Sequence, residues 1–147
     1  MSRLEFTSTV DVRVSPEQAF DYFADHRHVA DVLEGVTRWE PIGRKTRGVG
    51  ARYEVEMRAL GFPLASVLRL DRWKRPREIG WVSESGFIKQ RGGFTFEPVA
   101  DGVRIDLHIG YEPPGWIVGA VIARRMDASV RQSLDRALRR IKKVLES

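Results

Sequence analysis

Apolar and polar residues alternate along much of this chain, and turn residues interrupt the alternation repeatedly. The first alternating stretch runs from Leu4 to Val14. Later breaks fall at five places: Gly48, Gly61-Phe62-Pro63, Arg75-Pro76-Arg77, Ser85-Gly86 and Asp101-Gly102. A period of two is typical of half-buried strands, and Gly, Pro and Asp favour tight turns. The pattern predicts one early strand and, further along, about six strands in a meander.

Two short helices are predicted between the first strand and the meander. Ser15-Pro16-Glu17-Gln18 supplies an N-cap hydroxyl, a proline suited to the first helical turn and a glutamine three residues after the cap. One helix face then carries Ala19, Phe20 and Phe23. A second short helix, which we expect to stop at Gly35, is indicated by Val29, Val32 and Leu33.

Two stretches of the meander indicate which side of each strand faces the interior. Alternate positions are apolar: Val49, Ala51, Tyr53, Val55, Met57 and Ala59 in the first, and Val103, Ile105, Leu107, Ile109 and Tyr111 in the second. The positions between them are expected to face water: Arg52, Glu54, Glu56, Arg58, Arg104, Asp106 and His108. One apolar and one polar face imply an antiparallel sheet that is covered on one side.

The end of the chain is expected to supply that cover as one long helix. Pro113-Pro114 can begin a helix, and from Trp116 to Glu146 only Gly119 disfavours one. At about 1.5 Å per residue this helix would be long enough to cross seven strands. One apolar stripe holds Trp116, Gly119, Ala120, Ala123, Val130, Leu134, Ala137, Leu138, Ile141 and Leu145.

The first half of this stripe is made of small residues and leaves two interpretations open. Either Gly119, Ala120 and Ala123 leave room for a pocket of a few hundred cubic ångströms, or the helix packs more closely on the sheet. Asp127 falls near the middle of the stripe, where an unpaired carboxylate is costly to bury. Either Asp127 reaches a cavity or an arginine, or the helix bends between Gly119 and Asp127.

Composition and charge restrict the chemistry. The chain has no cysteine, which excludes disulfides, thiolate metal sites and cysteine nucleophiles. Its longest apolar run, Trp116 to Ala123, is far shorter than the roughly 20 residues that span a bilayer, and a cytoplasmic location is expected. The net charge of +5 belongs to residues 115–147, so the terminal helix would suit an anionic membrane. Its first two turns are apolar all round, with Ile117, Val118, Val121 and Ile122 on the side away from the sheet, which would suit a second copy of the chain. Its cations are not interleaved with aromatics, which disfavours nucleic-acid recognition.

The element order is that of the helix-grip fold, and the sequence resembles the SRPBCC, or START-like, superfamily. Its opening motif is similar to Val14-Ser15-Pro16-Glu17-Gln18-Ala19-Phe20-Asp21-Tyr22-Phe23-Ala24-Asp25, followed by Gly35-Val36. Four later segments resemble the polyketide cyclase/dehydrase-like branch of this superfamily: Trp81-Val82-Ser83 with Gly86, Gly93-Phe94-Thr95-Phe96-Glu97-Pro98, Gly102-Val103-Arg104-Ile105 and Tyr111-Glu112-Pro113-Pro114-Gly115.

The resemblance implies a single α+β domain over residues 1–147. A seven-stranded curved antiparallel sheet would wrap around the long C-terminal helix, with two short helices after the first strand. It also implies a cavity for a lipid, polyketide or isoprenoid-like molecule. The ligand-binding candidates are Tyr53, Val55, Met57, Ser66, Leu68, Trp81, Ser83, Phe94, Leu107, Ile109, Tyr111, Trp116, Gly119, Ala120 and Ala123.

Three functions remain open at this stage. The first is binding or carriage of an apolar molecule, because the inward positions offer few ionisable groups. The second is a polyketide cyclase or dehydratase in which Tyr53, Ser83 or Tyr111 would hydrogen-bond a ligand carbonyl. The third is a ribosome- or membrane-associated interaction protein.

No cofactor or metal is expected from the sequence. His26 and His28, with Asp25 and Asp31 nearby, are interpreted as a solvated polar turn, and Gly92-Gly93 as a strand kink or bulge.

Overall fold

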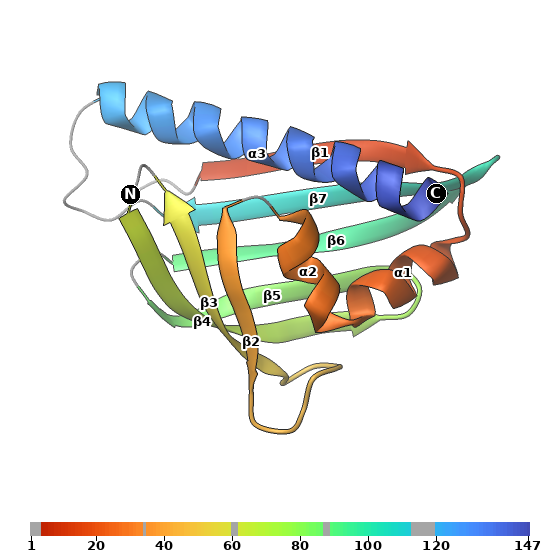
Figure 1. Cartoon of the computed structure of the whole chain (residues 1–147), viewed down its shortest axis with the longest axis horizontal. Coiled ribbons are helices and arrows are strands. Elements are labelled where there is room, and N and C mark those ends of the chain that lie inside the picture. Colours follow the sequence, from red (N-terminus) through yellow and green to blue (C-terminus); the bar gives the residue numbers. More distant parts are fainter. Residues whose placement is uncertain (1–3, 34, 60–61, 87–88, 113–119) are drawn as a thin grey trace.

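In the part of the chain that the structure describes, seven strands form one antiparallel sheet, and three helices lie against it (Figure 1). The computed structural model describes residues 4–33, 35–59, 62–86, 89–112 and 120–147. The elements in chain order are β1 (Leu4–Val12), α1 (Pro16–Ala24), α2 (His26–Val32), β2 (Val36–Ile42), β3 (Arg52–Ala59), β4 (Phe62–Lys74), β5 (Glu78–Gly86), β6 (Lys89–Val99), β7 (Gly102–Glu112) and α3 (Ala120–Glu146). The strand order is β1-β7-β6-β5-β4-β3-β2, so β1 and β2 are the edges. The predicted fold class is confirmed.

The two short helices begin as the sequence predicts. Gln18 donates its backbone N–H to the Ser15 hydroxyl (3.1 Å), and the Gln18 side chain accepts from the Ser15 N–H (3.2 Å), which completes the capping box. Asp25 caps α2 by accepting from the Arg27 N–H. The second helix ends at Val32, earlier than the predicted stop at Gly35, because the backbone of Leu33 is extended, although its N–H still donates the last helical hydrogen bond to Val29. Gly35 instead accepts a backbone hydrogen bond from Arg58.

The first turn of the meander corrects one predicted inward residue. Val49 is 51% exposed and precedes β3, which begins at Arg52. The cause is local, since Gly48 and Gly50 both have positive φ and turn the chain before the strand starts. The prediction is confirmed for Ala51, Tyr53 and Val55, which are buried, whereas Met57 is partly buried and the side chain of Ala59 is not described.

The outer face of the sheet carries charged residues, but some of them are partly buried against the sheet. Arg72 lies flat across Gly80 and Gly93, so that a Cβ at Gly80 would be 2.3 Å from the guanidinium carbon. Its Nη1 donates to Glu78 (3.0 Å) and its Nη2 to the Gly92 carbonyl (2.7 Å). His108, expected to face water, is half-buried beside this arginine, and burial lowers the pKa of its imidazole.

Gly92 and Gly93 do not form a bulge. The pairing of β6 with β5 and β7 continues through both residues without a register shift. Gly92 instead makes room on the inner face, because a Cβ there would lie 2.9 Å from the Trp81 ring. The register shifts in this part of the sheet lie between β4 and β5, with Glu84 as the extra residue on β5 and Asp71 as the extra residue on β4.

The terminal helix runs alongside β1 and contacts α2 (Figure 1). It follows the edge strand and does not cross all seven strands, which corrects the expectation from its length. The predicted stripe is confirmed where side chains are described, because Leu134, Ala137, Leu138 and Ile141 are buried. Trp116 and Gly119 lie outside the described residues, and the side chains of Ala120, Ala123 and Asp127 are not described either.

Polar contacts from α3 also satisfy the free edge of β1. Lys142 donates to the Asp11 carbonyl (2.8 Å), and Glu146 accepts from the Arg13 N–H (3.0 Å). The two side chains form an ion pair with each other at 2.8 Å. They therefore occupy edge groups that would otherwise be open to another strand.

No helix among the described residues combines the length and apolar character needed to span a bilayer.

Candidate functional site

The inner face of the sheet divides into two regions, and the predicted site residues fall into both. The first region, here called the aromatic core, consists of Phe23, Trp39, Tyr53, Trp81 and Phe94. α1 and α2 press on it, and Phe23 stacks on Phe94 with ring centroids 4.3 Å apart. The free volume among these rings is about 20 Å³, which is enough for about one water molecule. Trp81, Phe94 and Tyr53 therefore fill space in this structure.

The Tyr53 side chain is hydrogen-bonded to the loop between β2 and β3. Its hydroxyl donates to the Thr46 carbonyl, and its ring packs beside Trp39. Burial raises the pKa of Tyr53 to about 12. This arrangement favours a neutral phenol that holds the loop on the sheet.

The Tyr53 hydrogen bond leads to a prediction about alkaline stability. In the unfolded chain the phenol titrates near pH 10, so its contribution to folding is complete below pH 10 and is lost as the pH rises towards 12. Tyr53→Phe is expected to lower the free energy of unfolding by about 1 kcal/mol at neutral pH and to weaken this alkaline decline. Urea unfolding of both proteins between neutral and alkaline pH measures the difference. Parallel pH profiles would contradict the assignment.

The second region lies on the same face and is polar. Here called the Gln90 cluster, it comprises Met57, Ser66, Ser83 and Gln90. The Gln90 amide nitrogen lies 3.4 Å from the Ser66 hydroxyl and 3.9 Å from the Met57 sulfur. The Gln90 backbone N–H donates to the Ser83 hydroxyl (3.0 Å). Three predicted site residues are thus brought together by a fourth that the sequence analysis did not name.

Hydrogen-bonding capacity is left over in this cluster. Within the described residues, the hydroxyl hydrogens of Ser66 and Ser83 and the side-chain oxygen of Gln90 make no hydrogen bond. Ser66 is 8% exposed and is the one buried polar residue among those described. Ser66 already accepts from the Gln90 amide, and its free hydroxyl hydrogen can still donate to an oxygen atom of a bound molecule.

A gap in the sheet borders the cluster. The β5–β6 ladder ends at the pair Val82 and Arg91, and beyond it a pocket of about 280 Å³ opens between the strands. The lining includes Ser83 and Gln90 together with Lys89, Arg91 and Glu112. Charged side chains of the outer face therefore lie beside two members of the Gln90 cluster.

The remaining described candidates lie on β3, β4 and β7. Leu107 and Val55 are fully buried and Leu68 nearly so, whereas Ile109 is half-buried. Tyr111 stacks on Phe6 with centroids 6.0 Å apart, and Arg131 of α3 lies 5.1 Å above the Phe6 ring. Tyr111 is also the cross-strand partner of Gln90, which places it next to the cluster.

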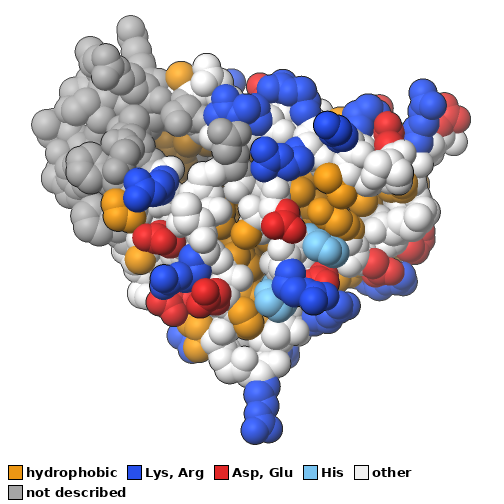
Figure 2. Space-filling model, viewed as in Figure 1, with side chains coloured by type: hydrophobic (Ala, Val, Ile, Leu, Met, Phe, Trp, Pro, Cys, Tyr) orange, Lys and Arg blue, Asp and Glu red, His pale blue; other side chains and the backbone are white. Residues whose placement is uncertain are grey.

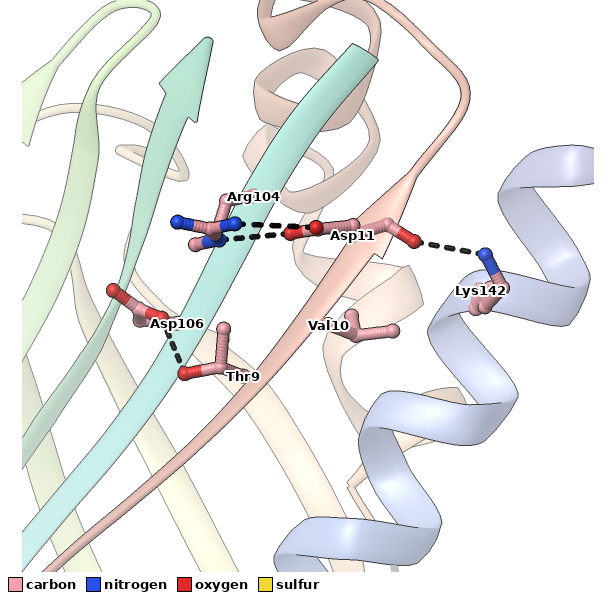
Figure 3. A pocket seen from close by; sticks show the side chains of 6 residues that line it. All are labelled: Thr9, Val10, Asp11, Arg104, Asp106 and Lys142. Carbon is pink, nitrogen blue, oxygen red and sulfur yellow. Dashed lines mark hydrogen bonds and ion pairs between the residues drawn. The ribbon is translucent and has the colours of Figure 1, made fainter. Parts of the chain in front are cut away.

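A larger surface groove, of about 720 Å³, lies between α3 and the outer side of β1 and β7 (Figure 3). Its polar groups already bind one another. Thr9 donates to Asp106 (2.6 Å), Arg104 pairs with Asp11 (2.9 Å), and Lys142 donates to the Asp11 carbonyl. We therefore do not regard this groove as the ligand site.

The polar turn around His26 and His28 also has its own contacts. Asp25 pairs with Arg27 at 2.6 Å, and His28 lies 2.7 Å from the Tyr22 carbonyl while stacking on the Tyr22 ring. His26 borders the aromatic core, and its Nδ1 is buried without a hydrogen bond among the described residues.

The curved seven-stranded sheet, the two short helices and the terminal helix place the protein in the helix-grip class of α+β folds. The family described as polyketide cyclase / dehydrase and lipid transport matches residues 3–146. The chain belongs to this family, as the resemblance predicted. A comparison with curated proteins gave no match.

Solved structures share the fold. The protein TTHA0849 from Thermus thermophilus is 18% identical with a TM-score of 0.83, over 97% of each chain. A START superfamily protein from Mycobacterium smegmatis is 14% identical with a TM-score of 0.74, over 95% of this chain and 98% of that one. Truncated norcoclaurine synthase from Thalictrum flavum is 16% identical with a TM-score of 0.70, over 99% and 96%. At these identities the likeness concerns the fold alone.

Proposed function

We propose that the protein binds or carries an uncharged hydrophobic molecule, of lipid, polyketide or isoprenoid type, between the sheet and α3. The observation that carries this proposal is the Gln90 cluster, a set of neutral polar groups with spare hydrogen bonds on an otherwise apolar inner face. Membership of a family described by cyclase, dehydrase and lipid-transport activities supports the same ligand class.

The chemistry of the cluster favours a ligand with a carbonyl or hydroxyl oxygen. The hydroxyls of Ser66 and Ser83 can donate to a carbonyl, and the Gln90 amide can accept from a hydroxyl. Neither serine nor glutamine supplies a charge to balance a carboxylate, and the nearby cations Lys89 and Arg91 have exposed side chains, so the cluster itself favours an uncharged oxygen. The remaining apolar positions, such as Ile109 and Met57, suit a hydrocarbon body.

Direct detection of a ligand comes first. Native mass spectrometry of the purified protein, followed by organic extraction, is expected to show one bound apolar molecule per chain. The protein is then titrated with a long-chain methyl ketone and with the alkane and carboxylic acid of equal length, using tryptophan fluorescence. If nothing co-purifies and none of the three binds, the proposal fails.

A Gln90→Leu variant tests the role of the cluster. Leucine removes the amide and keeps an apolar side chain of similar length, so the ketone is expected to bind about tenfold more weakly while the alkane binds as before. Glu97→Leu is the matched control, because Glu97 lies on the same strand and is exposed. Equal losses for ketone and alkane would show that Gln90 acts only through packing.

A cyclase or dehydratase is the second candidate, and the same hydroxyls favour it. A group that hydrogen-bonds a ligand carbonyl can also polarise it for an aldol cyclisation. Under this hypothesis Ser83→Ala and Tyr111→Phe abolish turnover of a poly-β-ketone substrate without loss of ligand binding. Variants that retain full turnover would remove both residues as catalytic candidates.

A further inference from the structure

The loop between β2 and β3, residues 43–51, is fixed to the body of the protein at several points. Gly43, Gly48 and Gly50 all have positive φ, which shapes its bends. The Thr46 carbonyl accepts from the Tyr53 hydroxyl, and the Gly50 N–H donates to the Leu70 carbonyl (2.8 Å). The backbone is thus held in place while its charged side chains remain on the outside.

This loop carries cations without ion-pair partners. Arg44, Lys45 and Arg47 are all exposed, and within the described part of the chain none of them forms an ion pair. Figure 2 shows a Lys or Arg side chain projecting from the lower tip of the molecule, where Figure 1 places this loop. Three positive charges within four residues, none of them in an ion pair among the described residues, make a strongly cationic tip.

The turn between β4 and β5 adds to the same surface. Lys74, Arg75 and Arg77 are exposed there, and Arg75 makes a two-pronged contact with Asp21 of α1 at 2.9 and 2.8 Å. That contact is the main cause of the lowered pKa of Asp21, and the charge of Arg47 lowers it further, so the loop and the turn converge near this carboxylate. We call residues 43–51 and 74–77 the basic end.

Three acidic groups around the basic end already have arginine partners, whereas Glu17, whose charge raises the pKa of Arg75, makes no ion pair among the described residues. Asp21 is held by Arg75, and Asp25 is held by Arg27 at 2.6 Å. Glu78, which follows the turn, is held by Arg72 at 3.0 Å. The loop cations are therefore not neutralised by these carboxylates.

Apolar side chains accompany the cations. The described residues include three exposed large hydrophobic side chains, and two of them belong to this surface: Val49, in the loop, is 51% exposed, and Ile42, just before it, is 36% exposed. Exposed aromatic rings, on which nucleic-acid bases would stack, are absent from the described part of this end. Cations beside aliphatic side chains match a bilayer surface, where phosphate groups overlie hydrocarbon.

We propose that the basic end docks the protein onto the surface of an anionic lipid bilayer. Arg44, Lys45 and Arg47 contact lipid phosphates, and Val49 enters the interface beside them. This surface is separate from the basic side of α3, to which the sequence had assigned the anionic contact. This proposal goes beyond ligand binding, because it names the surface through which a carrier of an apolar molecule would contact a membrane.

The test compares two variants that lose the same charge. Arg44→Gln/Arg47→Gln removes two cations from the loop, and Arg139→Gln/Lys143→Gln removes two exposed cations from α3. Co-sedimentation uses vesicles of phosphatidylcholine with and without phosphatidylglycerol, and thermal unfolding confirms that each variant is folded. The loop variant is expected to bind the anionic vesicles about 30-fold more weakly, since each cation near such a surface contributes about 1 kcal/mol. The α3 variant is expected to bind like wild type.

Further arms of the experiment identify the partner. Val49→Asn is expected to weaken vesicle binding, and added salt to weaken it further. Equal losses in the two charge variants, a loss in the α3 variant alone, or wild-type binding that does not require phosphatidylglycerol would overturn the proposal. Tighter wild-type binding to a single-stranded RNA than to the vesicles would also overturn it.

Discussion

Replacing Phe94 with alanine is expected to lower the free energy of unfolding by about 3–5 kcal/mol, the range seen for buried aromatic residues. Phe94 is 1% exposed, and its ring stacks on Phe23 from α1. It also meets Trp81 edge-on at 5.8 Å. Removing this ring opens a cavity where β6 and α1 meet. Urea unfolding monitored by tryptophan fluorescence and circular dichroism measures the loss.

The size of this effect separates two interpretations of Phe94. If the ring fills the aromatic core, alanine is strongly destabilising, and Phe94→Leu, which keeps most of the apolar volume, costs much less. If the ring instead lines an open ligand cavity, its truncation merely enlarges that cavity. A loss below about 1 kcal/mol for Phe94→Ala would therefore favour the ligand-lining role predicted from the sequence.

Phe94 illustrates how far the sequence could go. The alternation of residues is local, and it correctly placed Phe94, Trp81 and Tyr53 on the inner face. The alternation does not predict the distance between that face and α1, because contacts between residues far apart in the chain set this distance. The sequence could therefore name inward residues without separating those packed under a helix from those that border a site.

The Gln90 cluster was found only in part for a related reason. Ser66 and Ser83 were named because they occupy inward positions, but Gln90 lies before two glycines that were interpreted as a kink or bulge. Counting back by twos from Phe94 reaches Gln90 through Gly92, and the unbroken register of β6 shows that this count is valid. The alternation in β6 therefore predicts that Gln90 faces inward, but this is hard to recognise because Gly92 has no side chain at the position between Gln90 and Phe94.

Turn chemistry explains the wrong placement of Val49. Its apolar side chain fits the alternation of β3, yet Gly48 and Gly50 on either side hold the backbone at positive φ. Two glycines at positive φ therefore indicate a turn more reliably than one apolar residue between them indicates a strand. The same glycines leave Val49 exposed beside the loop cations, which is the basis for the proposed bilayer contact.

The second large effect is expected in the terminal helix, where Ile141→Ala should lower the free energy of unfolding by about 2–5 kcal/mol. Ile141 is fully buried in the hydrophobic core, on the stripe that α3 presents to the rest of the protein. Val144 is the matched control, because it lies on the same helix and is 40% exposed. Val144→Ala is expected to change stability by less than about 0.5 kcal/mol.

The difference in stability between these two variants tests which contacts hold α3 along the edge strand. The polar contacts of Lys142 and Glu146 with β1 are exposed, and exposed ion pairs contribute about 0–1 kcal/mol. Apolar burial at Ile141 and Leu138 must therefore supply most of the attachment. A double variant, Lys142→Met/Glu146→Gln, is expected to cost less than Ile141→Ala alone. The reverse order would mean that hydrogen bonds to the β1 edge, and not the apolar stripe, fix the helix in place.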